Sequence, residues 1–285
     1  MSTKVRGTFV LGLGAQKSGT SWLHDYLTTL DGVDMGFLKE YHVFDALRDD
    51  SSQIGDLAAK AQKVLAESGL DVPKRKNFWT QISFLADHRN YYNFFAGVLS
   101  QSGIRLTGDM TPCYSLLDAA MLTSIREGFA QRDVTCKAVF LMRDPVERLW
   151  SASRMWRMNR REAAVTDENV FVVKCLKRPM FDLRTRYEDT LAAMEAVFAP
   201  DDCLTGFYET LFQDSEIQRI CAFLGLEFRA PEFDKRVNVS QKTSPLSQDT
   251  CRTVAQHFAP TYRAVAERFG QARVLDLWPS ARFVL

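Results

Sequence analysis

The sequence lacks any long apolar run, carries almost no net charge, and has few residues of the kinds that build metal sites. No stretch approaches the roughly 20 apolar residues that a membrane-spanning helix needs, and the N-terminal residues do not resemble a secretory signal. The formal net charge of +1 excludes a general electrostatic attraction to nucleic acid or to anionic membranes. We therefore expect a cytoplasmic protein in which any anion-binding site is local.

Six cysteines and four histidines are spread along the chain without the spacing of a zinc motif or a disulfide framework. We expect reduced thiols and no metal site. A length of 285 residues with 46% apolar residues fits a single domain, 1–285, with a helical insertion at about 51–100. Helical spacing also predicts one continuous helix over 181–198, and one or two helices over 246–269 that end at Gly270.

The N-terminal stretch has the pattern of a strand, a tight loop and a helix. Residues 8–13 form a short aliphatic run of the kind found in buried parallel strands. Lys17, Ser18 and Gly19 follow, and apolar side chains then recur at helical spacing over 23–30. Such a loop presents successive backbone N–H groups at the positive end of a helix, so the pattern predicts an anion site.

The position of the lysine narrows the choice of anion. A loop that binds ATP or GTP has its lysine directly after the second glycine. Here Thr20 follows Gly19, and the lysine comes earlier, at Lys17. This displacement disfavours a P-loop-type kinase or nucleotidase, although that class and a non-catalytic nucleotide-binding module stay open as alternatives.

A second strand-to-helix element lies at 137–153. Its apolar strand ends at Arg143, Asp144 can cap the following helix, and Pro145 suits the first turn. An arginine at the carboxyl end of a strand lies where ligands gather in open α/β sheets, and its planar fork matches phosphate oxygens. Ser151 follows two turns further along the helix.

Together these two elements resemble the sulfotransferases that use 3′-phosphoadenosine 5′-phosphosulfate (PAPS), more closely the glycan and bacterial type than the phenol and steroid type. The run Lys-Ser-Gly-Thr-Ser-Trp at 17–22 is similar to the loop of that family, and Arg143 with Ser151 is similar to its 3′-phosphate motif. The resemblance extends from about Thr8 to Phe269. It implies a three-layer, P-loop-like α/β fold with a central parallel sheet flanked by helices, and a reaction that needs no metal.

The resemblance also implies which side chains bind PAPS and its product, 3′,5′-ADP. Tyr208, near the end of the last expected strand, would approach the adenine, with Trp22 nearby. Lys242, in the irregular stretch 236–245, would help to hold the 3′-phosphate. The implied donor-binding residues are Lys17, Ser18, Gly19, Thr20, Ser21, Trp22, Arg143, Ser151, Tyr208 and Lys242.

The segment 39–45 resembles the Lys/Asn-Glu-x-His-Phe-Phe segment of glycan sulfotransferases, in which the glutamate is the proposed catalytic base. The resemblance implies that role for Glu40, with His42 as the alternative because the phenol and steroid enzymes use a histidine. Glu40 could instead belong to a solvated Lys–Glu pair, and His42 could simply hold the loop. Lys17 is implied as the cation that stabilises the leaving phosphate. We expect a short strand near 33–36 to bring this segment to the edge of the sheet that carries the predicted anion-binding loop at 15–19, the phosphate loop.

Position 110 departs from the family pattern. The segment 109–114 resembles the family run acidic-Lys-Thr/Ser-Pro-x-Tyr, but Met110 stands where the glycan enzymes have a lysine. The acceptor class stays open among a small molecule, a lipid and a sugar, and Met110 disfavours a polyanionic glycan. Asp109 could steer the acceptor, orient Lys17, or only cap the turn.

Overall fold

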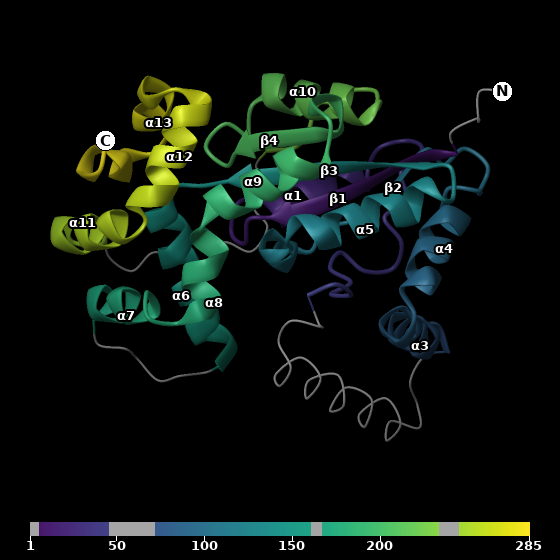
Figure 1. Ribbon diagram of the computed structural model, residues 1–285, viewed down its shortest axis with the longest axis horizontal. Coiled ribbons are helices and arrows are strands. Elements are labelled where there is room, and N and C mark those ends of the chain that lie inside the picture. Colours follow the sequence, from purple (N-terminus) through teal and green to yellow (C-terminus); the bar gives the residue numbers. More distant parts are fainter. Residues whose placement is uncertain (1–5, 46–71, 161–166, 234–244) are drawn as a thin grey trace.

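The fold is built around a parallel sheet at the centre of the molecule (Figure 1). The computed structural model describes residues 6–45, 72–160, 167–233 and 245–285. Its four described strands are hydrogen-bonded in the order β2-β1-β3-β4, and every neighbouring pair is parallel. They are β1 (Gly7–Gly14), β2 (Leu106–Asp109), β3 (Val134–Met142) and β4 (Cys203–Phe207). The parallel sheet that the sequence predicts is confirmed.

The central strand β1 has apolar side chains on both faces, as its aliphatic sequence predicts. Phe9 and Leu11 point to one face and Val10 to the other, because side chains alternate along a strand, and all three are fully buried. Two hydrophobic clusters result, one on each face of the sheet. A parallel sheet covered in this way is the middle of a three-layer fold, which confirms the predicted architecture.

Different helices cover the two faces. One cluster takes side chains from α1 (Thr20–Leu27) and α10 (Asp214–Leu224). The other cluster, around Phe9, includes side chains from α5 (Ala119–Ala130) and α9 (Tyr187–Val197), which pack against each other. In Figure 1, α10 and α5 accordingly lie on opposite sides of the sheet.

The other elements extend these two outer layers. Of the predicted helical insertion, two helices are seen, α3 (Val72–Ala86) and α4 (His88–Val98), and residues 51–71 lie outside the described part of the chain. The remaining elements are α6 (Pro145–Arg160), α7 (Glu168–Cys175), α8 (Pro179–Asp182), α11 (Gln248–His257), α12 (Ala259–Phe269), α13 (Gln271–Leu277), and the 3₁₀ turns η1 (Pro112–Leu116), η2 (Leu183–Thr185), η3 (Pro200–Asp202) and η4 (Pro279–Phe283). None of the described helices is long and apolar enough to cross a membrane.

Helix α6 begins as the sequence predicts. The Asp144 carboxylate accepts the N–H of Val146 at 3.0 Å, and Pro145 is the first helical residue. Helix α11 packs against α6, and the C-terminal helices lie at the end of the molecule opposite the N terminus (Figure 1). The helix that follows Arg143 is therefore held between the sheet and the C-terminal segment.

The strand expected near 33–36 is wrong. Only a single bridge forms there, between Val33 and Leu106. The reason is local, because the Asp34 carboxylate accepts the N–H of Gly36 at 2.8 Å and turns the chain away from the sheet.

The helix expected over 181–198 is split into α8, η2 and α9. The carbonyl of Phe181 accepts from the Arg148 guanidinium at 2.9 Å and from the Thr185 hydroxyl at 2.7 Å. These bonds take the place of the ordinary helical bond at that carbonyl, so the helix breaks. At the C terminus, α12 ends before Gly270 as predicted, but α13 and η4 follow it.

A partly buried carboxylate, that of Glu209, joins the end of β4 to the C-terminal segment. Glu209 accepts the backbone N–H of Asp144 and the indole N–H of Trp278, each at 3.1 Å. Burial raises the pKa of Glu209 from its ordinary 4.5 to about 7, the neighbouring Asp144 charge adds to the rise, and the two hydrogen bonds oppose it. The native state therefore binds this proton more tightly than the unfolded chain does.

We predict that Glu209→Gln flattens the pH dependence of stability. Between pH 4.5 and about 7, the native state keeps a proton that the unfolded chain loses, so the wild-type free energy of unfolding falls as the pH rises. A shift of this size corresponds to a loss of up to about 3 kcal/mol. Urea unfolding at about pH 5 and about pH 8 should show this loss in the wild type and a smaller one in Glu209→Gln. The exposed Glu127→Gln should keep the wild-type slope, and equal slopes in all three proteins would contradict the assignment.

Candidate functional site

The carboxyl ends of the four strands meet at one edge of the sheet, and polar residues follow each of them. Strand β1 leads into the loop 15–19, β2 ends at Asp109, β3 is followed by Arg143, and β4 is followed by Tyr208. The carboxyl edge of a parallel sheet is where ligands of open α/β folds bind. The candidate site is therefore assembled from all four strands.

The loop after β1 has the backbone geometry of an anion-binding turn. Lys17 and Gly19 both have left-handed backbones, with φ of 71° and 87°. For Lys17 this conformation costs roughly 1–3 kcal/mol, a strain that is commonly found where a ligand binds. A side chain on Gly19 would also collide with Leu211, which lies 2.4 Å from an added Cβ. Within the described part of the chain, the N–H groups of Lys17 and Gly19 donate to no acceptor, so they are available to an anion.

Two side chains of this loop lack the partners that buried polar groups normally have. The Ser18 hydroxyl is buried and has no hydrogen-bond partner among the described residues. Burial lowers the pKa of Lys17, and four neighbouring cations, Arg143 the strongest, lower it further. The loop thus combines an unused hydroxyl with positive charge that an anionic ligand would neutralise.

Arg143 lies against this loop. One of its guanidinium nitrogens donates to the Lys17 carbonyl at 3.1 Å, and another donates to the Glu147 carboxylate at 3.2 Å. The guanidinium carbon lies 4.3 Å from the centre of the Tyr208 ring, which in turn packs beside Gly19. The structure therefore brings together Lys17, Gly19, Arg143 and Tyr208, four of the residues that the sequence implicates.

The other implicated residues are more peripheral. Ser151 is buried on α6, two turns after Arg143, and Thr20 and Ser21 are in the first turn of α1. Trp22 is only 6% exposed and packs against three aromatic rings, those of Tyr26, Phe212 and Phe233. Its approach to an adenine stays a prediction. Lys242 lies outside the described residues.

The segment 39–45 carries a chain of opposite charges. Lys39 pairs with one Glu40 oxygen, and Nε2 of His42 lies 3.3 Å from the other. Nδ1 of His42 lies 2.8 Å from Oδ2 of Asp45. Both ring nitrogens of His42 therefore face carboxylates, whereas Glu40 keeps 35% of its side chain exposed to solvent.

These contacts fix the charges of the two candidate bases. Burial acts to raise the pKa of Glu40, but the hydrogen bond with His42 and the charge of Lys39 outweigh it and lower the pKa to about 2. Burial acts to lower the pKa of His42, but its bonds with Asp45, Cys113 and Glu40 raise the pKa to about 12. Glu40 is thus an ionised, partly exposed acceptor, while a doubly protonated His42 has no lone pair to offer.

A buried carboxylate at the end of β2 holds this segment in place. Asp109 is fully buried and accepts hydroxyl bonds from Thr111 at 2.6 Å, Tyr114 at 2.8 Å and Tyr91 at 2.9 Å. The Thr111 hydroxyl oxygen also accepts the N–H of Tyr41 at 3.0 Å. Burial raises the pKa of Asp109 to about 6, although the three hydroxyls lower it. A carboxylate enclosed in this way cannot touch an acceptor, so its contacts favour the turn-holding role.

An arginine that the sequence did not single out ties the phosphate loop to the helical layer. Arg148, on α6, is fully buried and donates to the backbone and side-chain oxygens of Gln16 at 3.3 and 3.2 Å. It also donates to the Phe181 carbonyl and, at 2.6 Å, to the Thr185 hydroxyl. Burial lowers the pKa of Arg148 to about 10, so it stays charged at neutral pH. Arginines of helices are usually exposed, so no sequence pattern marks this one as buried.

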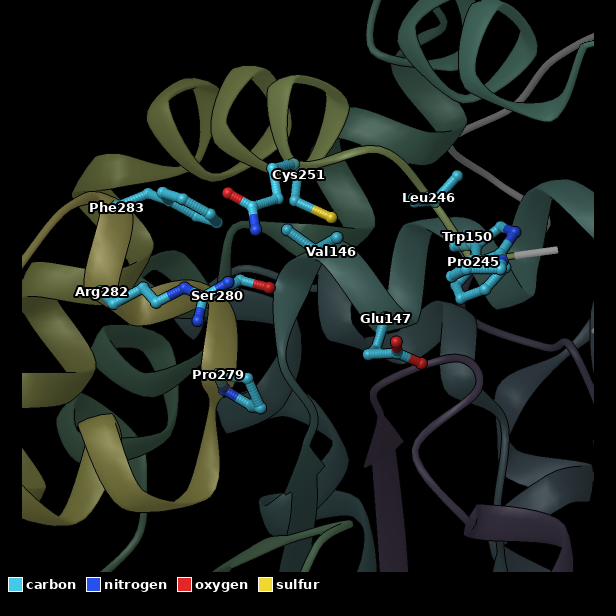
Figure 2. Close-up of a pocket in the computed structure, with 11 residues that line it drawn as sticks. Val146, Glu147, Trp150, Pro245, Leu246, Cys251, Pro279, Ser280, Arg282 and Phe283 are labelled. Carbon is cyan, nitrogen blue, oxygen red and sulfur yellow. The ribbon is translucent and has the colours of Figure 1, made fainter.

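A cavity of about 430 Å³ borders the site, between α6, α11 and η4. Figure 2 shows Val146, Glu147 and Trp150 of α6 on its wall, with Arg282 and Phe283 of η4 on another side. The described residues that line it are Val146, Glu147, Trp150, Pro245, Leu246, Gln248, Cys251, Pro279, Ser280, Arg282 and Phe283. Because Glu147 also pairs with Arg143, the cavity adjoins the Arg143 side of the site and not the Glu40 side.

Comparisons with known proteins were consistent with these features. Residues 8–256 match the family model described as a sulfotransferase domain. A sulfotransferase from Alicyclobacillus acidocaldarius is similar over 92% of this chain and 95% of its own, with a TM-score of 0.63 and 18% identity. The sulfotransferase domain of the Synechococcus PCC 7002 olefin synthase covers 91% of this chain and 97% of its own, with a TM-score of 0.50 and 15% identity.

A third solved structure, the sulfotransferase domain from the curacin biosynthetic pathway, covers 89% of this chain and 98% of its own, with a TM-score of 0.50 and 16% identity. At such identities the likeness shows a shared fold. These relatives are bacterial or biosynthetic sulfotransferases, as the sequence resemblance predicts. No curated protein matches the chain.

We predict that Arg148→Met destabilises the protein by about 2–4 kcal/mol, because it leaves buried oxygens around Gln16 and Thr185 without their charged donor. The free energy of unfolding in urea measures the loss. Arg252→Met, at a half-exposed position of α11, is the matched control and should change stability by less than about 0.5 kcal/mol. If both variants unfold at the wild-type urea concentration, the guanidinium of Arg148 does not hold the loop.

Proposed function

The chain belongs to the sulfotransferase family, and we propose that it transfers a sulfuryl group from PAPS to an acceptor hydroxyl or amine, releasing 3′,5′-ADP. The observation that carries this proposal is the combination of Lys17, whose pKa is lowered by burial and by four neighbouring cations, with the Ser18 hydroxyl, which has no hydrogen-bond partner among the described residues. PAPS would supply a phosphosulfate to this loop and a second phosphate nearby. Arg143, which donates to the Lys17 carbonyl at 3.1 Å, is the proposed partner of that second phosphate.

The donor is held by two groups of residues. The N–H groups and polar side chains of the run 17–22 bind the phosphosulfate, and Arg143 with Ser151 binds the 3′-phosphate. Tyr208, whose ring lies under Arg143, contacts the adenine, and Lys242 completes the 3′-phosphate site. A 3′-phosphate bound in this way fixes the reacting sulfur relative to the acceptor and distinguishes PAPS from ATP.

Sulfuryl transfer moves negative charge onto the oxygen that bridges sulfur and the 5′-phosphate. The bond from this oxygen to sulfur breaks while the acceptor oxygen or nitrogen forms a new bond to sulfur. Lys17 and the N–H groups of its loop stabilise the growing charge. A preorganised donor of this kind commonly lowers the barrier by roughly 3–4 kcal/mol.

Glu40 takes the proton that the acceptor loses. Its carboxylate is ionised and partly exposed, whereas both nitrogens of His42 are engaged by Asp45 and Glu40. His42 and Lys39 therefore act as positioning residues that hold the two Glu40 oxygens. The attacking hydroxyl becomes strongly acidic as its oxygen bonds to sulfur, so a weakly basic carboxylate suffices.

We predict that the wild type binds 3′,5′-ADP much more tightly than 5′-AMP, and that Arg143→Ala abolishes most of this difference. Loss of charge-assisted hydrogen bonds worth about 1.5–3 kcal/mol corresponds to roughly 10–100-fold in affinity. Isothermal calorimetry with each nucleotide measures the effect.

Arg263→Ala, on the exposed side of α12, is the matched control and should bind both nucleotides as the wild type does. Equal affinities for the two nucleotides in the wild type would remove the basis for a 3′-phosphate site. Tighter binding of ATP with magnesium than of 3′,5′-ADP would instead favour the kinase class.

We predict that Glu40→Gln lowers turnover of labelled PAPS by about 10²–10⁴-fold while leaving the affinity for 3′,5′-ADP unchanged, because the amide cannot take the acceptor proton. The measurement is sulfuryl transfer to a panel of phenols, alcohols and amines. Glu127→Gln, on the exposed surface of α5, should keep wild-type turnover. Undiminished transfer by Glu40→Gln would assign the base to another group.

A further inference from the structure

Three potential metal ligands converge beside the candidate base. His42, Asp45 and Cys113 each offer one ligand atom, and these atoms all lie within 4.8 Å of one another. Asp45 and Cys113 are 5% and 7% exposed, whereas the His42 side chain is 36% exposed. The cluster is therefore made of mostly buried groups and reaches solvent on the histidine side.

The convergence does not depend on a bound ion, because other contacts fix the backbone on both sides of the cluster. The N–H of Val43 donates to the Tyr114 hydroxyl at 3.1 Å, and the N–H of Tyr41 donates to the Thr111 hydroxyl at 3.0 Å. Thr111 and Tyr114 lie on either side of Cys113 in the chain. The histidine segment is thus held directly against the turn that carries the thiol.

The donor set suits zinc. An imidazole nitrogen, a thiolate and a carboxylate oxygen are all zinc ligands, and three protein ligands leave a fourth position open. Magnesium and calcium favour oxygen ligands alone. Bonds of about 2.0–2.3 Å place tetrahedral ligand atoms roughly 3.3–3.8 Å apart. Nδ1 of His42 and Oδ2 of Asp45 lie 2.8 Å apart, so they would have to move apart by less than about 1 Å to reach that spacing.

The second ring nitrogen of His42 gives an independent indication. Nε2 lies 3.3 Å from the Glu40 carboxylate, and a metal-bound histidine almost always donates its other N–H to such a group. We propose that His42, Asp45 and Cys113 form a binding site for a divalent transition-metal ion such as Zn²⁺, with Glu40 as the carboxylate that orients the histidine.

Metal binding at this site exchanges protons for the ion and involves no redox step. The ion replaces the proton on Nδ1 of His42 and the thiol proton of Cys113, and both protons pass to solvent. The Nε2–H stays on His42 and continues to donate to Glu40. The ion would therefore fasten the segment 42–45 to the turn η1 without disturbing Glu40. The site is independent of donor binding, because neither the phosphate loop nor Arg143 contributes a ligand.

Cobalt titration of the reduced, chelator-stripped full chain tests this site without any nucleotide. One equivalent of Co²⁺ should produce a thiolate-to-cobalt charge-transfer band in the near ultraviolet, and Zn²⁺ should displace it. Cys113→Ser should abolish the band, and Asp45→Asn should weaken Co²⁺ binding. Glu40→Gln, which changes only the outer partner, should weaken it by about 10–100-fold.

Cys203→Ser is the matched control, because Cys203 is a free thiol on β4, outside the three-residue cluster, and should keep the full band. Circular dichroism establishes whether each variant is folded. If Cys113→Ser does not fold, Asp45→Asn is the variant that tests the site. Absence of the band in the wild type, or its persistence in folded Cys113→Ser, would overturn the proposal and leave an ordinary hydrogen-bonded His–Asp pair. A wild type that fails to bind 3′,5′-ADP would count against the proposed donor site and not against the metal site.

Discussion

The candidate reaction centre depends on one buried carboxylate, that of Asp109 at the end of β2. An ionised carboxylate in a dry interior is costly unless several donors surround it, and here three hydroxyl groups do so. Two of those hydroxyls, of Thr111 and Tyr114, also accept N–H groups of the segment that carries Glu40 and His42. The sheet, α4, η1 and the segment of the candidate base therefore share one polar network. An unpaired polar group in such a buried network is costly, and the three hydroxyl groups around Asp109 are each hydrogen-bonded.

The phosphate loop has the opposite character, because some of its polar groups have no partner in the part of the chain that the structure describes. The Ser18 hydroxyl is one of them, Lys17 has a strained backbone, and the nearby cations destabilise one another. The folded chain tolerates these costs because Arg148 fastens Gln16 to the helical layer from behind. An anion that entered the loop would recover the electrostatic part of this cost, which is how a site is prepared for a highly charged ligand.

The features that could be predicted from the sequence are those determined by residues close together in the chain. The aliphatic run of β1, the glycine-bounded loop and the capped start of α6 were all predicted, because each depends on neighbours in the chain. The features that it missed depend on distant contacts. Arg148 breaks the expected helix at Phe181, and Cys113 meets His42 only after folding. No spacing rule connects positions so far apart. The failed strand at 33–36 had a local signal, an Asx turn at Asp34, that apolar periodicity alone overlooks.

The fold also explains why Met110 replaces the lysine of the glycan enzymes. Met110 is 1% exposed and packs with the hydrophobic cluster that contains α1 and α10, so its side chain belongs to the core and not to the site. Its sulfur would lie 2.2 Å from a Cβ on Gly12, which means that the glycine makes room for it. A lysine in this conformation would bury its ammonium among apolar side chains.

Without a lysine at position 110, Lys17 is the cation proposed to lie beside the transferring group, because Lys39 is paired with Glu40. If the proposed function is correct, we infer that such a centre disfavours a polyanionic acceptor and favours a small or amphiphilic one.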